Sequence, residues 1–252
     1  MSGEAASRAT LTLPGIQQEL AEEIKKVGKP IALILFNGRP LELEWFDKNM
    51  DAIVEAWFLG TEAGNAIADV VFGDYNPSGK ITASFPRFVG QVPINYNYHS
   101  TGRPPIVPDQ RGGHTTRFND MSNTPLYPFG YGLSYSRFEY TDLTLNQYEM
   151  TKDDVIQASI TVKNKGKVEG EEIIQLYLQD IVASRIRPVK ELKGFKKVML
   201  QPGESQTLVF QINLEMLKFY NNNNQFIAEP GNFNVFIGSS SENYLKRSFT
   251  LI

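Results

Sequence analysis

The sequence predicts an α/β part followed by an all-β part, and three observations support this division. In the first part, helical periodicity alternates with short continuous apolar runs, which is typical of layered α/β structure. In the last part, short alternating runs follow one another with turn residues between them. Between the two, residues 86–128 show neither a helical nor a strand period, and six prolines interrupt the sequence from position 93 to position 128. We expect the parts to span residues 1–88 and 137–252, with 89–136 as a long loop and linker.

The first part begins with a predicted helix over residues 14–27. Apolar residues recur there at helical spacing, Pro14 suits a first helical turn and Gly28 suits an end. A second helix is expected over residues 62–72, with Thr61 as its N-cap and Gly73 as its stop.

Continuous apolar runs predict strands between and after these helices. Residues 31–36 and, less regularly, 52–60 read as strands that are buried on both faces, and 81–85 as a short third strand. Strands buried on both faces need neighbours, and this part of the sequence supplies few. The pattern therefore predicts a piece of a layered α/β sheet, smaller than a complete doubly wound domain.

The second part predicts an antiparallel sandwich of the immunoglobulin or fibronectin type III kind. About seven short strands with turns every 8–12 residues favour this architecture. Residues 221–224, four consecutive asparagines, are expected to form a polar hairpin tip. The clearest strand-like runs are residues 138–145, 155–163, 172–178, 192–200, 206–212 and 232–237.

Composition excludes several classes of function. The net charge is −3, which offers no electrostatic case for binding nucleic acid or an anionic membrane. Cysteine is absent and only His99 and His114 are present, so thiolate chemistry is excluded and a histidine-rich metal site is impossible. No apolar run is long enough to cross a bilayer, and the N-terminus does not have the pattern of a signal peptide. We expect no metal and no cofactor.

The long loop contains the weaker candidates for ligand contacts. Tyr96 could stack on a sugar face, and His99, Arg103 and Arg117 lie beside it in the sequence as further candidates for substrate contacts. The alternative is that these aromatic and histidine side chains anchor the loop by packing. Near the N-terminus, Glu4 stands in a run of small residues, and spacing alone would leave it as a solvated surface charge.

Seven stretches taken together resemble the C-terminal part of bacterial glycoside hydrolase family 3 enzymes, the β-glucosidase and β-xylosidase type. They are SGEAASR, KPIALILFNGRPL, AIVEAWFLGTEAGNAIADVVFGDYNPSGKITASFP, NTPLYPFGYGLSY, VKNKGKVEGEEIIQLYLQD, RPVKELKGFKKVMLQPGES and EPGNFNVFIG. The resemblance covers the whole chain. It is carried most specifically by the combination of GNAIADVVFGDYNPSGK with PFGYGLSY.

This resemblance implies an architecture and a role for one residue. Enzymes of this type have a (β/α)8 barrel, then an α/β sandwich and then a fibronectin type III-like domain. The chain would be a partial α/β sandwich domain followed by the fibronectin type III-like β-sandwich, with the N-terminal barrel domain and its aspartate nucleophile missing. Glu4 matches the general acid/base, on a loop that reaches over the barrel. A retaining glycosidase needs two carboxyl groups about 5–5.5 Å apart.

The expected function follows from this resemblance. The chain would be the C-terminal part of a retaining β-glycosidase that hydrolyses terminal β-glucosides or related β-glycosides, and alone it is expected to be inactive. Two alternatives remain: a non-catalytic carbohydrate-binding or interaction module, and an inactive truncated fragment. By family analogy we expect a periplasmic or secreted protein, and a homodimer is an open possibility.

Overall fold

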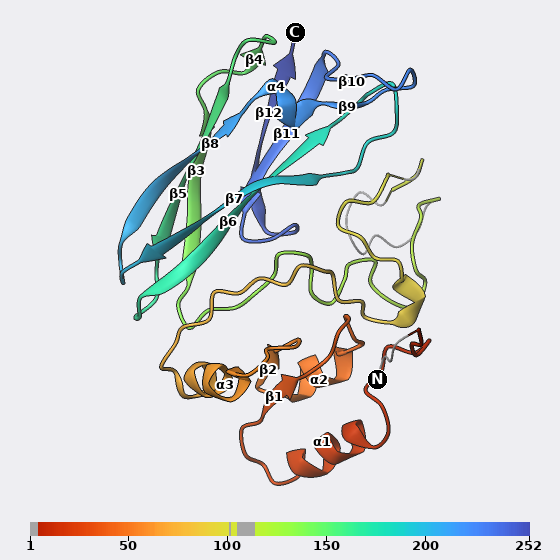
Figure 1. Ribbon diagram of the computed structural model, residues 1–252, viewed down its shortest axis with the longest axis vertical. Coiled ribbons are helices and arrows are strands. Elements are labelled where there is room, and N and C mark those ends of the chain that lie inside the picture. The colour runs from red at the N-terminus through yellow and green to blue at the C-terminus, as the bar shows by residue number, and fades with distance from the viewer. Residues whose placement is uncertain (1–4, 101, 105–113) are drawn as a thin grey trace.

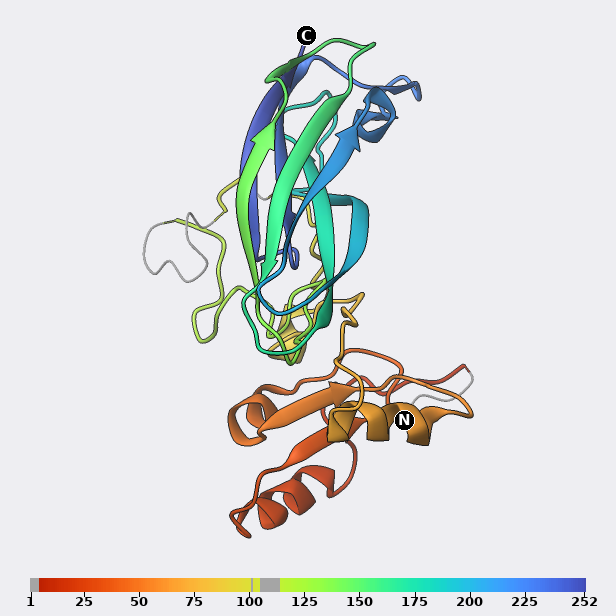
Figure 2. The same ribbon diagram turned by 90° about the vertical axis from the view of Figure 1, so that its left-hand side faces the viewer.

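The computed structural model describes residues 5–100, 102–104 and 114–252, and in it the α/β part and the β-sandwich lie at opposite ends (Figure 1). A long connecting segment, which contains the short helix η1 (Val89–Gln91), runs between them. Figure 2, turned by a quarter, shows the same separation, with α1 at the end farthest from the sandwich.

The α/β part contains two parallel strands and three helices. The strands pair from Ala32↔Ala52 to Leu35↔Glu55, so their carboxyl ends meet at the same edge. The helices and both strands that the sequence predicted are confirmed, whereas the helix between the strands was not predicted. The elements are α1 (Gln17–Lys25), β1 (Ala32–Leu35), α2 (Glu44–Asn49), β2 (Ala52–Glu55) and α3 (Ala63–Phe72).

Three local predictions for this part are wrong. The N-cap of α3 is Glu62, whose side chain makes no capping bond, and Thr61 lies outside the helix. Residues 81–85 form no strand: Phe85 makes one bridge with Tyr127, and Ile81 is hydrogen bonded to the backbone of Gly130 and Tyr131. Neither strand is buried on both faces: only Leu35 of β1 is fully buried, and no residue of β2 is. The left-handed Gly73, at φ 88°, does end α3 as predicted.

The sandwich consists of two sheets that enclose the larger core. One has the order β4-β12-β11-β6-β7 and the other β3-β5-β8. All six strongly patterned strands are confirmed, while β12 was not singled out. The strands are β3 (Phe138–Leu145), β4 (Glu149–Met150), β5 (Ile156–Asn164), β6 (Gly170–Asp180), β7 (Glu191–Leu200), β8 (Ser205–Ile212), β11 (Gly231–Gly238) and β12 (Tyr244–Leu251).

The asparagine run forms a hairpin tip, as predicted. Strands β9 (Phe219–Tyr220) and β10 (Phe226–Ile227) pair in antiparallel fashion on either side of it, after the short helix α4 (Leu214–Leu217). The Asn221 side chain accepts hydrogen bonds from the backbone N–H groups of Asn223 and Gln225, which closes the turn.

A buried polar cluster joins the two parts. Lys80 Nζ lies 3.2 Å from a carboxylate oxygen of Glu172 on β6, and both side chains are almost fully buried. Tyr140 donates its hydroxyl to the same carboxylate at 2.6 Å. Nearby, Gln175 Nε2 donates to the Gly130 carbonyl at 3.0 Å. These bonds fix the connecting segment onto the first half of β6.

Candidate functional site

The N-terminal segment is tied to the edge of the sheet where β1 and β2 end. Arg39 Nη2 donates to the Thr10 carbonyl at 2.8 Å, and the backbone N–H of Glu42 donates to the Leu11 carbonyl at 3.0 Å. In parallel sheets, ligands bind beyond the carboxyl ends of the strands. Glu4 lies outside the described residues, six positions before Thr10, so the chain that leads to it is anchored at this edge.

The same edge holds a carboxyl group that the sequence analysis did not single out. Glu55 ends β2, and its Oε1 accepts the backbone N–H of Trp57 at 3.1 Å. Trp57 has a left-handed backbone, with φ 49°, which is rare for a bulky residue. Burial raises the pKa of Glu55 above its ordinary value, and the hydrogen bonds from Trp57 and Asn37 oppose that rise. A lone charged residue in the apolar run AIVEAWF was the available signal.

Tyr96, predicted to contact sugar, is half-buried and contacts both the sandwich and the connecting segment. Its ring stacks on Phe129, with centroids 4.2 Å apart, and meets Tyr177 edge-on at 5.8 Å. Its hydroxyl oxygen accepts the backbone N–H of Leu192 at 3.2 Å. These contacts fit the anchoring alternative, since ring and hydroxyl are both occupied.

His99 and its neighbour Tyr98 lie alongside the segment that connects β6 to β7. The Tyr98 carbonyl accepts the Val189 N–H at 3.0 Å, and His99 forms a β-bridge with Pro188. The ring of Tyr98 remains 55% exposed. Burial, followed by the charge of Glu242, raises the pKa of Tyr98. The backbone is therefore held by the sandwich while both side chains stay open to solvent.

Arg103 and Arg117 lie on two segments of the loop whose backbones are joined by a hydrogen bond. The Arg103 carbonyl accepts the Thr116 N–H at 2.8 Å, and Arg117 Nη1 donates to the Thr115 hydroxyl at 3.4 Å. Arg103 is exposed and Arg117 half-buried. The structure thus brings the backbone segments of the two arginines together, and it places Tyr96 and His99 against the sandwich. That any of the four contacts substrate stays a prediction.

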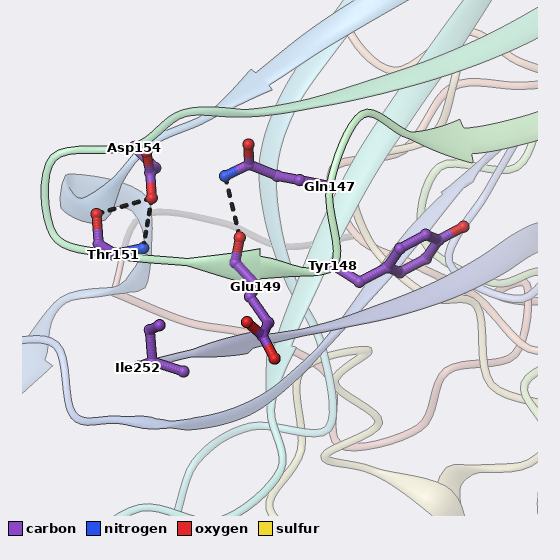
Figure 3. A pocket seen from close by; sticks show the side chains of 6 residues that line it. All are labelled: Gln147, Tyr148, Glu149, Thr151, Asp154 and Ile252. Atoms are coloured by element: carbon purple, nitrogen blue, oxygen red, sulfur yellow. Dashed lines mark hydrogen bonds between the residues drawn. The ribbon is translucent and has the colours of Figure 1, made fainter.

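Other parts of the described structure offer fewer groups that could bind or react with a ligand. Among the described residues there is no group of three carboxylates and histidines that could hold a metal ion, and no helix long and apolar enough to cross a membrane. A shallow hollow of about 520 Å³ lies near the C-terminus, at the end of the sandwich away from the α/β part (Figure 3). Its polar groups satisfy one another: Asp154 accepts both the N–H and the hydroxyl of Thr151.

The described chain thus combines a small parallel α/β unit with an antiparallel sandwich, and its N-terminal segment is held at the carboxyl edge of the α/β unit. Comparison with known proteins identifies both parts. Residues 1–135, more than half of the chain, match the glycosyl hydrolase family 3 C-terminal domain, and residues 172–241 match a fibronectin type III-like domain. The chain belongs to glycosyl hydrolase family 3.

Several relatives resemble the chain over nearly its whole length. It is 53% identical to a periplasmic β-glucosidase of Salmonella typhimurium over all of this chain and 33% of the relative. It is 43% identical to a β-xylosidase of Formosa agariphila, over 95% of this chain and 32% of the relative. The crystal structure of a Listeria innocua β-glucosidase with glucose superposes with a TM-score of 0.93 at 44% identity, over 99% of this chain and 34% of the other. The chain therefore spans about a third of the length of these relatives and corresponds to their C-terminal part.

Proposed function

We propose that this chain supplies the acid/base half of a retaining β-glycosidase active site that hydrolyses terminal β-glucosides or closely related β-glycosides. The observation that carries the proposal is the match of the whole chain to β-glucosidases and β-xylosidases. The names of these relatives favour glucosides and xylosides as substrates. The name of the Salmonella typhimurium relative favours a periplasmic or secreted location.

In this proposal, Glu4 is the general acid/base. It protonates the leaving oxygen while a second carboxylate attacks the anomeric carbon, and it then deprotonates the water that releases the sugar. The second carboxylate belongs to a barrel domain outside these 252 residues. The bonds from Arg39 and Glu42 to the segment at Thr10 and Leu11 support a fixed departure point for the Glu4 loop.

The uncovered apolar surface of the α/β part supports the participation of further structure. One face of α1 exposes four aliphatic side chains, and the two-stranded sheet has no other strand beside it among the described residues. Exposed apolar patches of this kind mark contact surfaces. In the proposed enzyme this face is covered by the remainder of the α/β sandwich. The four side chains are Ile16 (72% exposed), Leu20 (57%), Ile24 (46%) and Val27 (69%).

The long loop is proposed to border the leaving-group side of the site. His99, Arg103 and Arg117 would be the contributors, with Tyr96 acting as an anchor that holds the loop on the sandwich. The stacking of Tyr96 on Phe129 supports that division of roles.

The test is a chimera in which this chain replaces the matching C-terminal third of the Salmonella typhimurium relative. Glu4→Gln should lower hydrolysis of p-nitrophenyl β-D-glucoside by about 10²–10⁴-fold, because general acid–base catalysis contributes that much. Azide should restore turnover in this variant and give glucosyl azide, since azide needs no general base.

The matched control is Asp153→Asn, an exposed carboxyl on a sandwich turn, which should leave turnover unchanged. Equal activity of the Glu4→Gln chimera and its parent would refute the role of Glu4. Activity on the β-D-xyloside, measured in parallel, assigns the sugar preference.

A further inference from the structure

The segment that leads to Glu4 consists of small residues, so it cannot be held in place by burying its own side chains. Ala5, Ala6 and Ser7 are all exposed. Alanine and serine offer little apolar area that a neighbouring element could cover. A fixed position of this segment must therefore come from hydrogen bonds to the residues that follow it.

Two arginine side chains meet at Thr10 and supply such bonds. Arg39 Nη2 donates to the Thr10 carbonyl at 2.8 Å, and Arg8 Nη2 donates to the Thr10 hydroxyl at 2.9 Å. Arg8 also donates through Nη1 to the Thr12 carbonyl at 3.2 Å, which closes the turn around Thr10. The guanidinium groups carry a charge, so these bonds are stronger than those of neutral donors. Arg8 thus shapes the segment from within, while Arg39 holds it from the loop after β1.

The loop that carries Arg39 is itself held in place. Asn37 Nδ2 donates to the Arg39 carbonyl at 2.7 Å. A Cβ at Gly38 would lie only 2.9 Å from the Phe58 ring, so the loop packs closely against the segment after β2. Two positions after Arg39, Leu41 is buried in the α/β core. The half-buried Arg39 side chain therefore extends from a fixed backbone.

We infer that Arg39 is a positioning residue, which docks the backbone at Thr10 and thereby sets where the Glu4 carboxyl group can reach. The catalytic part of this inference rests on the proposed role of Glu4, whereas the docking of Thr10 does not. A general acid must lie within hydrogen-bond reach of the oxygen that it protonates. A displacement of about 1 Å can lower the rate of a reaction by about 10²-fold. Arg39 would therefore serve the protonation of the leaving group through the backbone alone.

The first test is amide hydrogen exchange in the 252-residue chain, which compares Arg39→Met and Arg39→Lys with wild type. The readout is the Glu42 amide, which donates to the carbonyl of Leu11, the residue after Thr10, at 3.0 Å. The Ala56 amide, which donates to the Leu35 carbonyl at 2.9 Å, reports whether the α/β part stays folded. The matched control is Arg247→Met, which makes the same change at an exposed position of β12.

Arg39→Met should exchange the Glu42 amide about tenfold faster than wild type, because one of the bonds that dock the segment is lost. Arg39→Lys should stay closer to wild type, since lysine still supplies a charged donor. The control should match wild type, and Ala56 should exchange equally in all variants. Unchanged exchange at Glu42 in Arg39→Met would overturn the inference. Faster exchange at Ala56 in that variant would overturn it too, because Arg39 would then support the fold of the whole α/β part.

The second test separates positioning of the acid from general support of the enzyme. In the chimera with the Salmonella typhimurium relative, kcat/KM is measured for cellobiose, whose leaving sugar needs a proton, and for 2,4-dinitrophenyl β-D-glucoside, whose leaving group departs as an anion. Arg39→Met should lower kcat/KM for cellobiose by about 10²-fold and leave that for the dinitrophenyl glucoside nearly unchanged. The later role of Glu4 as a base does not enter, because kcat/KM covers only the steps up to release of the leaving group.

Equal losses on the two substrates, or no loss on either, would overturn the positioning role. Arg247→Met should leave both values unchanged, and Arg39→Lys should recover part of the loss on cellobiose. The exchange measurement uses no hydrolysis, so it decides whether Arg39 docks the segment even if the glycosidase proposal fails. That proposal fails separately, when the Glu4→Gln chimera is as active as its parent.

Discussion

The sandwich and the α/β part of this chain differ in how completely each buries its apolar residues. The sandwich encloses twenty fully buried apolar side chains between two sheets, whereas the α/β core has six. The strands of the sandwich pair into sheets of five and three, while among the described residues β1 and β2 pair only with each other. The apolar face of α1, which periodicity identifies as a core face, is exposed.

This difference indicates which part is complete within the chain. The two sheets of the sandwich bury the apolar faces of each other. The α/β part has apolar surfaces that only a larger sheet would bury. The same part anchors the Glu4 segment at its carboxyl edge. The region that depends most on further structure is therefore the region that carries the proposed chemistry.

The largest effect on stability is expected when a phenylalanine in each region is replaced by alanine. Phe233→Ala removes a sandwich side chain that is 1% exposed, and should cost about 3–5 kcal/mol of unfolding free energy. Phe72→Ala, at the end of α3, removes one that is 82% exposed, and should change stability by less than about 0.5 kcal/mol. Urea unfolding measures both. Equal costs would remove the distinction between the regions.

The junction between the regions gives the next effect. Lys80→Met leaves the Glu172 carboxylate buried without its cation, and should cost about 3 kcal/mol of unfolding free energy. Adding Glu172→Leu should recover much of that loss, because the unpaired charge is removed as well. Urea unfolding of the single and double variants measures this. A double variant that loses the sum of both single losses would show that the pair is not coupled.

A smaller, pH-dependent effect is expected in the sandwich. Burial raises the pKa of Asp180 from 3.8 to about 6; Arg187 opposes this rise, while Glu229 and Glu191 add to it. A carboxyl group with a raised pKa binds its proton more tightly in the folded state. Its contribution to stability is present below its unfolded pKa and is lost as pH rises through about 6.

The urea midpoint of wild type should therefore fall between about pH 3.5 and about pH 7.5. The midpoint of Asp180→Asn should fall less over the same pH range, because the asparagine side chain does not titrate. Asp153→Asn, at an exposed turn, is the control and should follow wild type. Parallel curves for Asp180→Asn and wild type would contradict the raised pKa.

The smallest effect on stability is expected at the exposed face of α1. Leu20→Gln with Ile24→Gln should leave the unfolding free energy within about 0.5 kcal/mol, because both side chains already face solvent. The same double variant should bind less of a hydrophobic fluorescent dye and self-associate less. A substantial loss of stability would mean that this face is covered within the chain.

The same contrast explains which elements could be predicted from the sequence. Strand β5 shows a strong alternating pattern because one of its faces packs on a core that lies within the chain. Strand β6 shows a continuous apolar run because residues 174–178 are buried on both faces. Residues 81–85 do not form the expected strand, because the facing segment, residues 126–131, pairs with them only at Ile81 and Phe85. Helix α2 was missed because its six residues are too few to show a helical period.

The candidate site was partly predictable. The SGEAASR motif identified Glu4 through resemblance, and the proposal for its role still rests on that motif together with the family membership. Glu55 was missed because its partial burial, which raises its pKa, depends on tertiary packing that the run AIVEAWF does not reveal. Tyr96 was chosen as a sugar contact for its ring, and only the structure shows what that ring packs against. The boundaries after residues 88 and 136 stay predictions.

The most direct test of the central claim is hydrolysis of p-nitrophenyl β-D-glucoside by the purified 252-residue chain, beside the chimera that contains a family 3 barrel. We expect no turnover above background from the chain and measurable turnover from the chimera, because one carboxyl group cannot both attack the sugar and protonate its leaving group. Turnover by the chain alone that is abolished by Glu4→Gln would contradict the claim, since both carboxyl groups would then lie within these residues.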